Sequence, residues 1–571
     1  MAKDIVIRIG GEGGEGVISA GDMLAQASAR AGLEVLTFKT FPAEIKGGYA
    51  MYQLRVSPEK VLSHVDIFNV FVAFNREAYE INKGLLTPGT VLVYDGPGGD
   101  FEPEPLQGVV QYPVPMTRIS KIELSNLISK NMVALGAVMQ LFSFPIESLK
   151  YLIRTKFRKK GEDVVEMNIK ALEAGAEYVR SNIKKVDSFY VQTAQPEKDV
   201  IMLSGNDAIG LGALVAGCRF FSCYPITPAT DIANWLSKHL PKANGVVVQA
   251  EDEIASLGQV IGASYAGVKA MTGTSGPGLD LMVELLGFAS MAELPIVIAD
   301  VQRGGPSTGL PTKSEQSDLF LAAMGGHGDF PRIVLAAASV EDCFYLTVEA
   351  FNLAERYQIP VILLSDAALA FRTEKITRPD ISKIKVINRE IYSGNGGYQR
   401  YAVTETGVSP VSIPGQEGGR YIATGLEHSE TAAPKYSPDY HTKMTEKRFK
   451  KIANIEDEFP APESEGDEKG DIGIISWGLT QCAVREAIKA CADKGLKVRA
   501  LYPKLIFPVP VNAIRRFAST VKKVLIPELN YQGQLAILVA SYAGIDSIRY
   551  NIYGGFPFTP DQMRKKIEEI I

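Results

Sequence analysis

Three short stretches of the chain carry polar residues of the kinds that catalysis and ligand binding use. The first is SCYPITPAT, residues 222–230, in which Pro225 and Pro228 enclose a hydroxyl side chain. Each proline fixes its own φ and disfavours helical geometry in the residue before it, so Thr227 is held in an extended segment. A strand that ends there directs Thr227 at a ligand or at a neighbouring loop.

The second stretch places Glu251, Asp252 and Glu253 between the strand-like VVVQA and the Ala/Gly-rich IASLGQVIGASYAG. Acidic residues at the start of a helix can act as caps that the helix dipole stabilises. In the alternative interpretation, Glu253 is kept in an apolar setting and exchanges a proton with a nitrogen atom of a cofactor. The helix after Glu253 is almost uncharged, which suits burial. Both interpretations stay open at this point.

The third stretch, DVQRGGPSTGLPT, brings Arg303 from the strand PIVIADV into a loop of glycine and proline. An arginine at the carboxyl end of a parallel strand lies where open α/β sheets bind ligands, and its guanidinium matches a carboxylate. The alternative is a surface arginine in a turn. The segment TSGPGL contains Gly276 and Gly278, which permit close approach of a ligand or another chain. We expect Thr227, Glu253 and Arg303 at one edge of one sheet.

A glycine loop, GEGGEG, lies between the N-terminal strand DIVIRIG and a helical pattern. Its G-x-G-x-x-G spacing is typical of dinucleotide sites, in which a pyrophosphate binds at the helix N-terminus. Such a site also needs an acidic residue at the end of the second strand, and here that strand ends near Lys39. We therefore favour another anionic or adenine-bearing ligand over NAD, with tight packing as the alternative. The candidate loop residues are Gly11, Gly13, Gly14 and Gly16.

The elements that must position these residues form three α/β blocks in a chain of 571 residues. Strand-like runs alternate with helical patterns in each block, which predicts sheets covered by helices. In the first block we expect a largely parallel sheet. The expected parts are an α/β domain over 1–185, a linker over 186–198, a second α/β domain over 199–375, a long and partly solvated connection over 376–468, and a third α/β domain over 469–571.

The composition argues against several classes of function. A net charge of -5 and a hydrophobic content of 46% predict a mildly acidic globular protein that binds neither nucleic acid nor a membrane. There is no apolar window of about 20 residues and no signal-peptide pattern, so we expect a cytoplasmic protein. The five cysteines form no CxxC pair and the five histidines are scattered. We therefore expect no iron–sulfur cluster and no metal ion bound by this chain itself.

Five segments occur in an order that resembles the alpha subunit of 2-oxoacid:ferredoxin oxidoreductases. They are YPITP, QAEDEIASLGQVIGASYAG, MTGTSGPGLDLM, RGGPSTGLPT and PELNYQGQLA. The segments GEGGEGV, EIKGGYAMYQLRVS and NMVALGA resemble the gamma subunit of the same enzymes, fused ahead of alpha. The resemblance covers nearly the whole chain. It implies a gamma-type domain, a pyrimidine-type thiamine diphosphate domain and a C-terminal domain similar to that of transketolase.

The resemblance also implies roles for three residues. Thr227 would face the substrate within the thiamine diphosphate site, and Arg303 would bind the substrate carboxylate. The glutamate that hydrogen-bonds N1′ of the aminopyrimidine falls on Glu253, because the spacing to the Gly-Ala of IGAS fits it better than Glu251. Coenzyme A would be the co-substrate that takes the acyl group, and the glycine loop is a candidate to bind it.

Two signatures of the family are missing from this chain: a GDG motif followed by a distant asparagine, and a cysteine cluster. The resemblance therefore implies that Mg²⁺ and a [4Fe-4S] cluster belong to a separate beta subunit, which shares the thiamine diphosphate. Ferredoxin would accept the electrons, and a dimer of alpha-beta heterodimers is expected. One departure is Lys46, where the family has arginine, and it leaves the contacts to coenzyme A open.

The fused gamma-alpha order and the polar loop STGLPTKSEQSD resemble the branch of the family that uses 2-oxoglutarate. A second substrate carboxylate needs a cation, for which Lys313 or a residue of the beta subunit is a candidate. We expect conversion of 2-oxoglutarate and coenzyme A to succinyl-coenzyme A, or the reverse carboxylation, as in the reductive tricarboxylic acid cycle. The alternatives are an enzyme for pyruvate or for many 2-oxoacids, a nucleotide-dependent dehydrogenase, and a non-catalytic scaffold subunit.

Overall fold

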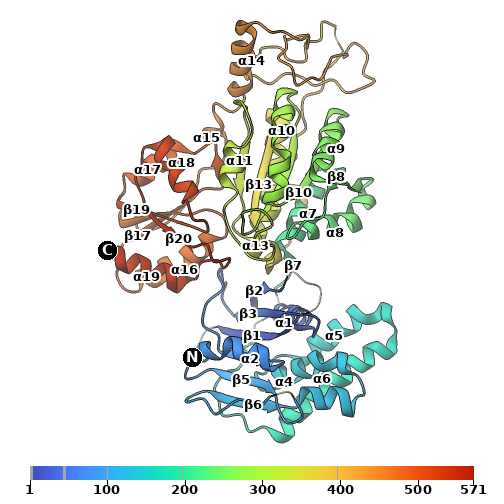
Figure 1. Cartoon of the computed structure of the whole chain (residues 1–571), viewed down its shortest axis with the longest axis vertical. Helices are drawn as coiled ribbons and strands as arrows, with labels where there is room; N and C mark the ends of the chain where they lie inside the picture. Colours follow the sequence, from blue (N-terminus) through green and yellow to red (C-terminus); the bar gives the residue numbers. More distant parts are fainter. Residues whose placement is uncertain (1–3, 43–46, 100, 194, 196, 395) are drawn as a thin grey trace. The chain divides into compact units, whose positions relative to one another are not determined.

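The computed structural model describes the chain apart from residues 1–3, 43–46, 100, 194, 196 and 395. The chain divides into two compact units (Figure 1). The first comprises Met1–Leu203 together with Arg372–Arg378, and the second comprises Ser204–Phe371 together with Pro379–Ile571. The chain therefore leaves the first unit, returns to it for one strand, and leaves it again. Three β-sheets with intervening α-helices confirm the expected α/β class.

The first unit contains an eight-stranded sheet in the order β6-β5-β4-β1-β3-β2-β14-β7. β1, β4, β5 and β6 are parallel, whereas β3 is antiparallel to β1 and β2, and β14 is antiparallel to β2. The expectation of a largely parallel sheet was wrong for the part of the sheet that contains β3, β2 and β14. β2 and β3 follow each other without the crossover helix that parallel neighbours need. The strands are β1 (Ile5–Glu12), β2 (Glu34–Thr40), β3 (Tyr49–Ser57), β4 (Val70–Ala73), β5 (Val91–Asp95), β6 (Val110–Val114), β7 (Val200–Ser204) and β14 (Thr373–Thr377).

The helices of the first unit pack closely through small residues. A Cβ added at Gly136 of α4 would lie 1.9 Å from the carbonyl oxygen of Leu172 in α6, and one at Gly175 of α6 would lie 2.0 Å from that of Val133 in α4. The glycines of NMVALGA and of its partner helix therefore allow backbone contact. The helices are α1 (Val17–Arg30), α2 (Arg76–Asn82), α3 (Met116–Arg118), α4 (Lys130–Leu141), α5 (Ile146–Phe157) and α6 (Glu162–Asn182).

The second unit contains a seven-stranded sheet in the order β18-β12-β13-β11-β10-β8-β9. All neighbours in it are parallel except β18, which is antiparallel to β12. The strands are β8 (Phe220–Cys223), β9 (Val246–Gln249), β10 (Ala270–Thr274), β11 (Ile296–Gln302), β12 (Ile333–Ala336), β13 (Pro360–Asp366) and β18 (Leu505–Phe507). The helices are α7 (Gly205–Val215), α8 (Thr230–His239), α9 (Glu253–Tyr265), α10 (Gly276–Met291), α11 (Leu319–Met324), α12 (Val340–Tyr357) and α13 (Ala367–Phe371).

A five-stranded sheet, in the order β15-β17-β16-β19-β20, occupies the C-terminal part of the second unit. One apolar core contains residues of both sheets, such as Ile298 and Val334 from the first and Ile475 and Ile526 from the second. This shared core explains why the two sheets form one compact unit. The elements are β15 (Glu463–Gly466), β16 (Gly470–Ile475), β17 (Val498–Tyr502), β19 (Val521–Glu528), β20 (Ile548–Asn551), α16 (Thr480–Ala492), α17 (Val511–Ala518), α18 (Gln534–Ala543) and α19 (Pro560–Ile570).

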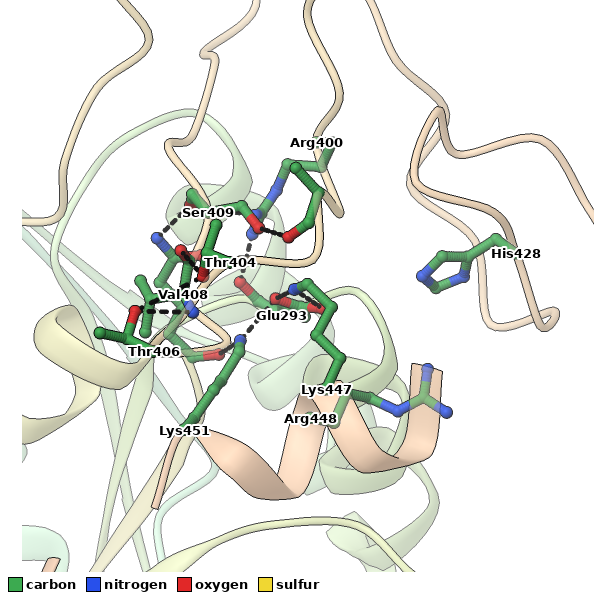
Figure 2. Close-up of polar contacts among 12 residues, drawn as sticks. Glu293, Arg400, Thr404, Thr406, Val408, Ser409, His428, Lys447, Arg448 and Lys451 are labelled. Carbon is green, nitrogen blue, oxygen red and sulfur yellow. Dashed lines mark hydrogen bonds and ion pairs between the residues drawn. The ribbon is translucent and has the colours of Figure 1, made fainter. Parts of the chain in front are cut away.

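A buried charge cluster attaches the long connection to the rest of the second unit (Figure 2). Lys447 Nζ lies 2.7 Å from Glu293 Oε1, Lys451 Nζ lies 2.5 Å from Glu293 Oε2, and all three side chains are fully buried. Arg400 Nη2 donates to the backbone carbonyl of Glu293 at 2.6 Å. Lys447 and Lys451 of the charged run TEKRFKKI, residues 445–452, therefore anchor part of the connection internally. The helices of the connection are α14 (Pro438–Lys450) and α15 (Ile455–Glu458).

Candidate functional site

The carboxyl ends of the parallel strands in the seven-stranded sheet meet at one edge, where the segments that follow them form the candidate site. Thr227 follows β8, Glu253 begins α9 after β9, and Arg303 follows β11. α10 begins at Gly276, directly after β10. β8, β9, β10 and β11 are neighbours and parallel. The three residues chosen from the sequence therefore lie at one edge of one sheet.

Thr227 and Arg303 are in direct contact. Arg303 Nη1 donates a hydrogen bond of 2.7 Å to the backbone carbonyl of Thr227. Arg303 is only 7% exposed, and its Nε has no hydrogen-bond partner in the described part of the chain. Burial lowers the pKa of the guanidinium, and the charge of Asp318 opposes that effect. A buried arginine with unused donors is suited to bind a carboxylate, which rules out the alternative of a surface turn.

Glu253 is the first residue of α9 and is buried, with 6% of its surface exposed. The cap of this helix is Asp252, whose side chain accepts a 2.7 Å hydrogen bond from the backbone N–H of Ala255. Among the described residues, none donates a hydrogen bond to the Glu253 carboxylate. Glu251, by contrast, is exposed. The capping role therefore belongs to Asp252, and Glu253 is left to contact a ligand.

The glycines of TSGPGL make room for acidic side chains at the start of α10. A Cβ added at Gly278 would lie 2.7 Å from Glu253 Cγ and 2.1 Å from Thr274 Oγ1. A Cβ added at Gly276 would lie 2.6 and 2.7 Å from the two carboxylate oxygens of Asp318. Glu253 and Asp318 thus both pack against the N-terminal turn of one helix, and any larger residue in that turn would displace them.

A cavity of about 830 Å³ opens beside Arg303. Its walls come from the N-terminal turn of α10, from the loop after β11 and from the loops that follow β19 and β20. Asp280, Glu315 and Asp318 line it together with the arginine. Burial raises the pKa of Glu315 and raises that of Asp318 to about 7. The cavity therefore combines one cation with carboxyl groups, of which Asp318 titrates near neutral pH.

Sequence reasoning missed Asp300 and Asp318. Asp300 is fully buried in β11, and its pKa is raised well above the usual range by burial and, to a lesser extent, by Asp318. A signal for Asp300 was present, because it is the one charged residue in the strand IVIADVQ. Nothing in the loop STGLPTKSEQSD distinguishes Asp318 from its polar neighbours, so only the structure reveals that its Oδ2 atom is buried.

The segment PELNYQGQLA holds the far wall of this cavity in place. Glu528 is fully buried at the end of β19 and accepts hydrogen bonds from the backbone N–H groups of Leu535 and Ala536, at 2.8 and 3.1 Å. It thereby binds the N-terminal turn of α18 to the strand. Burial raises the pKa of Glu528 against the lowering effect of these hydrogen bonds. The loop between them presents Asn530 and Tyr531 to the cavity.

The glycine loop of the first unit joins β1 to α1. Gly13 donates a backbone hydrogen bond of 2.9 Å to the carbonyl of Gly48, so part of the loop is already paired. Gly14 and Gly16 have φ values of 105 and 85°, which favour glycine. A Cβ added at Gly11 would lie 2.8 Å from Glu15 Oε2. Two of the four glycines are thus needed for the turn, and close packing requires a third.

A second cavity, of about 780 Å³, lies at this loop and is lined by Gly13, Gly14 and Gly16. Lys130 Nζ lies in its wall, 3.1 Å from Asp95 Oδ2 and 3.4 Å from Glu15 Oε1. Its positive charge is therefore already shared by two carboxylates, which weakens the case for a pure anion site. Lys46, the departure noted in the sequence, lies outside the described residues.

Three family models match the chain in succession. The model for pyruvate ferredoxin/flavodoxin oxidoreductase matches residues 6–178. The thiamine diphosphate-binding model of pyruvate flavodoxin/ferredoxin oxidoreductase matches residues 211–447, and the model for core domain II of pyruvate:ferredoxin oxidoreductase matches 470–562.

Full-length relatives decide the family. The alpha subunit of 2-oxoacid:ferredoxin oxidoreductase 2 from Aeropyrum pernix is 31% identical over 95% of this chain and 94% of its own length. The 2-oxoglutarate oxidoreductase subunit KorA from Mycobacterium tuberculosis is 33% identical over 99% of this chain and 91% of its own. The chain belongs to the alpha subunits of the 2-oxoacid:ferredoxin oxidoreductases. The resemblance seen in the sequence motifs is thereby confirmed.

A solved structure of this family has the same fold along the whole chain. The 2-oxoglutarate:ferredoxin oxidoreductase from Magnetococcus marinus is 54% identical, with a TM-score of 0.96 and full coverage of both chains. That structure holds 2-oxoglutarate, coenzyme A and succinyl-CoA. Within the described residues of the present chain, no group of three or more His, Cys, Asp or Glu residues could hold a metal ion. No helix in the described ranges is long and apolar enough to span a membrane.

Proposed function

We propose that this chain is the alpha subunit, with a fused gamma domain, of a 2-oxoglutarate:ferredoxin oxidoreductase. With its beta subunit it converts 2-oxoglutarate and coenzyme A to succinyl-coenzyme A and CO₂ and passes two electrons to ferredoxin, or runs the reverse carboxylation. The observation that carries the proposal is Arg303, a buried guanidinium that faces a cavity at the carboxyl edge of the sheet. The likeness to the Magnetococcus marinus enzyme supports the choice of substrate.

In this proposal Arg303 binds the carboxylate next to the keto group, which every 2-oxoacid has. The hydrogen bond to the Thr227 carbonyl fixes the plane of the guanidinium and leaves its other N–H groups for the substrate. The Thr227 hydroxyl, which makes no hydrogen bond to another described residue, faces the same substrate. The arrangement orients the keto carbon without taking part in bond breaking.

The residues present fit thiamine diphosphate. Glu253 is a buried carboxylate without a donor in the described chain, and it needs one to offset the cost of burial. A protonated aminopyrimidine nitrogen would supply such a donor, and Glu253 would give that proton to the nitrogen and take it back. When bound, thiamine diphosphate supplies the nucleophilic carbon and the electron sink for decarboxylation. The Gly276–Gly278 turn keeps the space beside Glu253 open.

We assign the remaining components as follows. The beta subunit shares the thiamine diphosphate and carries Mg²⁺ and the [4Fe-4S] cluster, because this chain has no CxxC pair. The complex is a cytoplasmic dimer of alpha-beta heterodimers that reduces ferredoxin. Coenzyme A binds at the cavity beside Gly13, Gly14 and Gly16, where the neutralised Lys130 favours the uncharged part of the molecule over its phosphates.

The distal carboxylate of 2-oxoglutarate requires a cation, and Lys313 is our candidate in this chain. Its Nζ lies 4.8 Å from the centre of the Phe556 ring, and burial lowers its pKa. Its positive charge is partly desolvated, which favours an additional contact with an anion. Lys313→Met should therefore raise KM for 2-oxoglutarate and leave KM for pyruvate unchanged.

The test is a steady-state comparison of 2-oxoglutarate, pyruvate and 2-oxobutyrate on the assembled complex, with ferredoxin reduction as the readout. We expect reduction that depends on coenzyme A and a kcat/KM that is highest for 2-oxoglutarate. A kcat/KM for pyruvate equal to or above that for 2-oxoglutarate would contradict the substrate and leave the thiamine chemistry intact. Full activity of the complex after Glu253→Gln would contradict catalysis by this chain and favour a scaffold.

A further inference from the structure

Two aspartates, the buried Asp300 of β11 and the half-buried Asp318 of the cavity wall, have buried carboxylate oxygens without hydrogen-bond partners in the described chain. Asp300 is fully buried in β11, and neither of its carboxylate oxygens has a partner within the described chain. Asp318 Oδ2 likewise lacks a partner there. Asp318 lines the same cavity as Arg303. The site thus contains a polar group that is buried, unpaired and directed at the space where a substrate would bind.

The backbone around Asp318 fixes its position. Its N–H donates a 3.1 Å hydrogen bond to Oε1 of Gln302, the residue before Arg303. Its carboxylate packs against Gly276, where an added Cβ would lie 2.6 Å from Oδ1. Asp318 is therefore attached to the segment that carries the arginine and to the N-terminal turn of α10. A side chain held at both ends keeps its place whether or not a ligand is present.

Two unpaired carboxylates cannot both ionise in such a place. Transfer of an ionised carboxylate from water to an apolar site is so costly that the group binds a proton instead, and a second carboxylate nearby adds repulsion. Glu315 and Asp280 add negative charge around Asp318, and Arg303 adds the opposing positive charge. Burial and the two acidic neighbours raise the pKa of Asp318 to about 7, and burial raises the pKa of Asp300 well above its usual range.

We propose that Asp318 couples binding of the substrate carboxylate at Arg303 to the uptake of one proton. Ionised, Asp318 is attracted to Arg303 in the empty site and repels an incoming carboxylate. When it is protonated, Asp318 donates a hydrogen bond to the substrate carboxylate, and the Arg303 guanidinium is free to bind that carboxylate. The proton comes from solvent on binding and returns there on release, so no bond other than O–H forms or breaks. The inference rests on the proposed function in one respect, namely that Arg303 receives the carboxylate.

The kinetic test measures KM and kcat for 2-oxoglutarate between pH 6 and 9 on the holoenzyme complex. In the wild type, KM should rise about tenfold per pH unit above pH 7, with little change in kcat, because only the protonated site binds well. In Asp318→Asn, KM should be independent of pH over this range. Asp280→Asn is the matched control, because Asp280 lines the same cavity from α10 but is exposed. It removes only a minor negative charge near Asp318, so the rise in KM should persist and begin at slightly lower pH. A profile for Asp318→Asn equal to that of the wild type would overturn the proposal.

The variant Asp300→Asn decides which of the two aspartates, Asp300 or Asp318, takes up the proton. Asp300 is not among the described residues that line the cavity, and Asp300→Asn leaves the carboxyl group of Asp318 in place. The rise in KM above pH 7 should therefore persist in Asp300→Asn. If Asp300→Asn abolishes that rise and Asp318→Asn does not, the assignment of the proton to Asp318 is wrong.

A readout independent of turnover uses N-oxalylglycine, a 2-oxoglutarate analogue whose amide carbonyl resists attack. Calorimetric titration of the wild-type complex in phosphate and in Tris at pH 8 should report uptake of about one proton per site, and almost none at pH 6. Absence of uptake at pH 8 in the wild type would refute the proposal even if Asp318→Asn does not fold. If the complex uses pyruvate and not 2-oxoglutarate, the substrate proposal fails and the same titration is made with oxamate, which tests proton coupling separately.

Discussion

Arg303 and Thr227 form a unit in which a backbone carbonyl, and not a side chain, orients the guanidinium. A hydrogen bond to a carbonyl leaves the positive charge uncompensated, whereas a carboxylate partner would have cancelled it. Arg303 therefore keeps its full attraction for an anion while its geometry is fixed. The residue that modulates this attraction is Asp318, whose charge acts on Arg303 without forming an ion pair within the described chain.

Replacement of Arg303 by alanine should weaken binding of all 2-oxoacids alike. Loss of a charged hydrogen-bond donor costs about 1.5–3 kcal/mol, so KM should rise roughly 10- to 100-fold for 2-oxoglutarate, pyruvate and 2-oxobutyrate. Arg303→Lys should recover only part of the loss, because a lysine cannot form the forked contact. Steady-state kinetics on the three substrates provide the measurement, and a rise confined to one substrate would contradict the role.

Glu253→Gln keeps the shape of the side chain and removes its ability to accept a proton. Because proton exchange with the cofactor nitrogen would be lost, kcat should fall by about 10² or more. Glu251→Gln is the matched control: it lies two residues away, is exposed, and should have little effect. Ferredoxin reduction at saturating substrate measures both variants. The opposite order of effects would show that the catalytic carboxylate is Glu251.

Residues at strand ends could be predicted from the sequence, and their contact partners could not. The prolines around Thr227 and the strand before Arg303 indicate where each residue lies along the chain, and parallel strands then bring both to one edge. The hydrogen bond from Arg303 goes to a backbone carbonyl, which no residue type reveals. Asp318 was missed because its burial depends on Gly276 and Gln302 from other segments.

At the level of elements, the charge cluster of α14 sets how firmly the connection is attached. One buried carboxylate, Glu293, faces Lys447 and Lys451, so the cluster has an excess of positive charge. Burial, reinforced by the neighbouring cations against the attraction of Glu293, lowers the pKa of Lys451 to about 7. The carboxylate is the component that both lysines depend on.

Glu293→Gln should loosen α14 strongly, because it leaves two buried lysines without a counter-ion. A loss of about 3–5 kcal/mol corresponds to a fall in amide hydrogen-exchange protection of α14 by a factor of 10² or more. Lys443→Met on the same helix is the control. The Lys443 side chain is 46% exposed and pairs with Glu430 at the surface, so the change should have little effect on the protection of α14. Equal effects of the two variants would exclude a buried anchor.

The same cluster predicts a pH dependence of local stability. Between pH 7 and about 10, Lys451 is neutral in the folded chain, while a lysine in the unfolded chain has its ordinary pKa of 10.5 and is still protonated. The unfolded state then binds more protons, so stability rises with pH in this window. Exchange of α14, corrected for its intrinsic rate, should therefore slow in the wild type relative to Lys451→Met as pH rises from 7 to 10. A constant difference between the two would contradict a lowered pKa for Lys451.

Most helices and strands could be predicted from periodicity, including α4 over KNMVALGAVMQLF and the parallel strands of the second unit. Pairing between strands that lie far apart in the sequence could not be predicted. β14 pairs Glu374 with Leu36 of β2, a partner more than 330 residues earlier in the chain. The burial of Lys447 and Lys451 could not be predicted either. A run of charged residues has the pattern of a solvated helix, and the sequence does not show that Glu293 lies against it.

At the level of the whole molecule, this chain contains binding groups for substrate and cofactor but no cysteine cluster for electron transfer. We expect the purified chain to be colourless and inactive. Addition of the beta subunit should produce a brown complex that reduces ferredoxin with 2-oxoglutarate and coenzyme A. Absorbance and turnover are measured for the chain with and without the beta subunit. Turnover by the chain alone would contradict the assignment of the electron-transfer cluster to the beta subunit.

The return of residues 372–378 to the first unit has a consequence for any attempt to divide the gene. A fragment that ends at Leu203 would lack β14, the strand that separates β2 from β7. Its β2 edge would be left bare, and a bare edge recruits foreign strands and promotes aggregation. The missing heptapeptide, supplied separately, would have to complete the sheet by strand complementation. A single cut between the two units therefore removes a strand from the first unit.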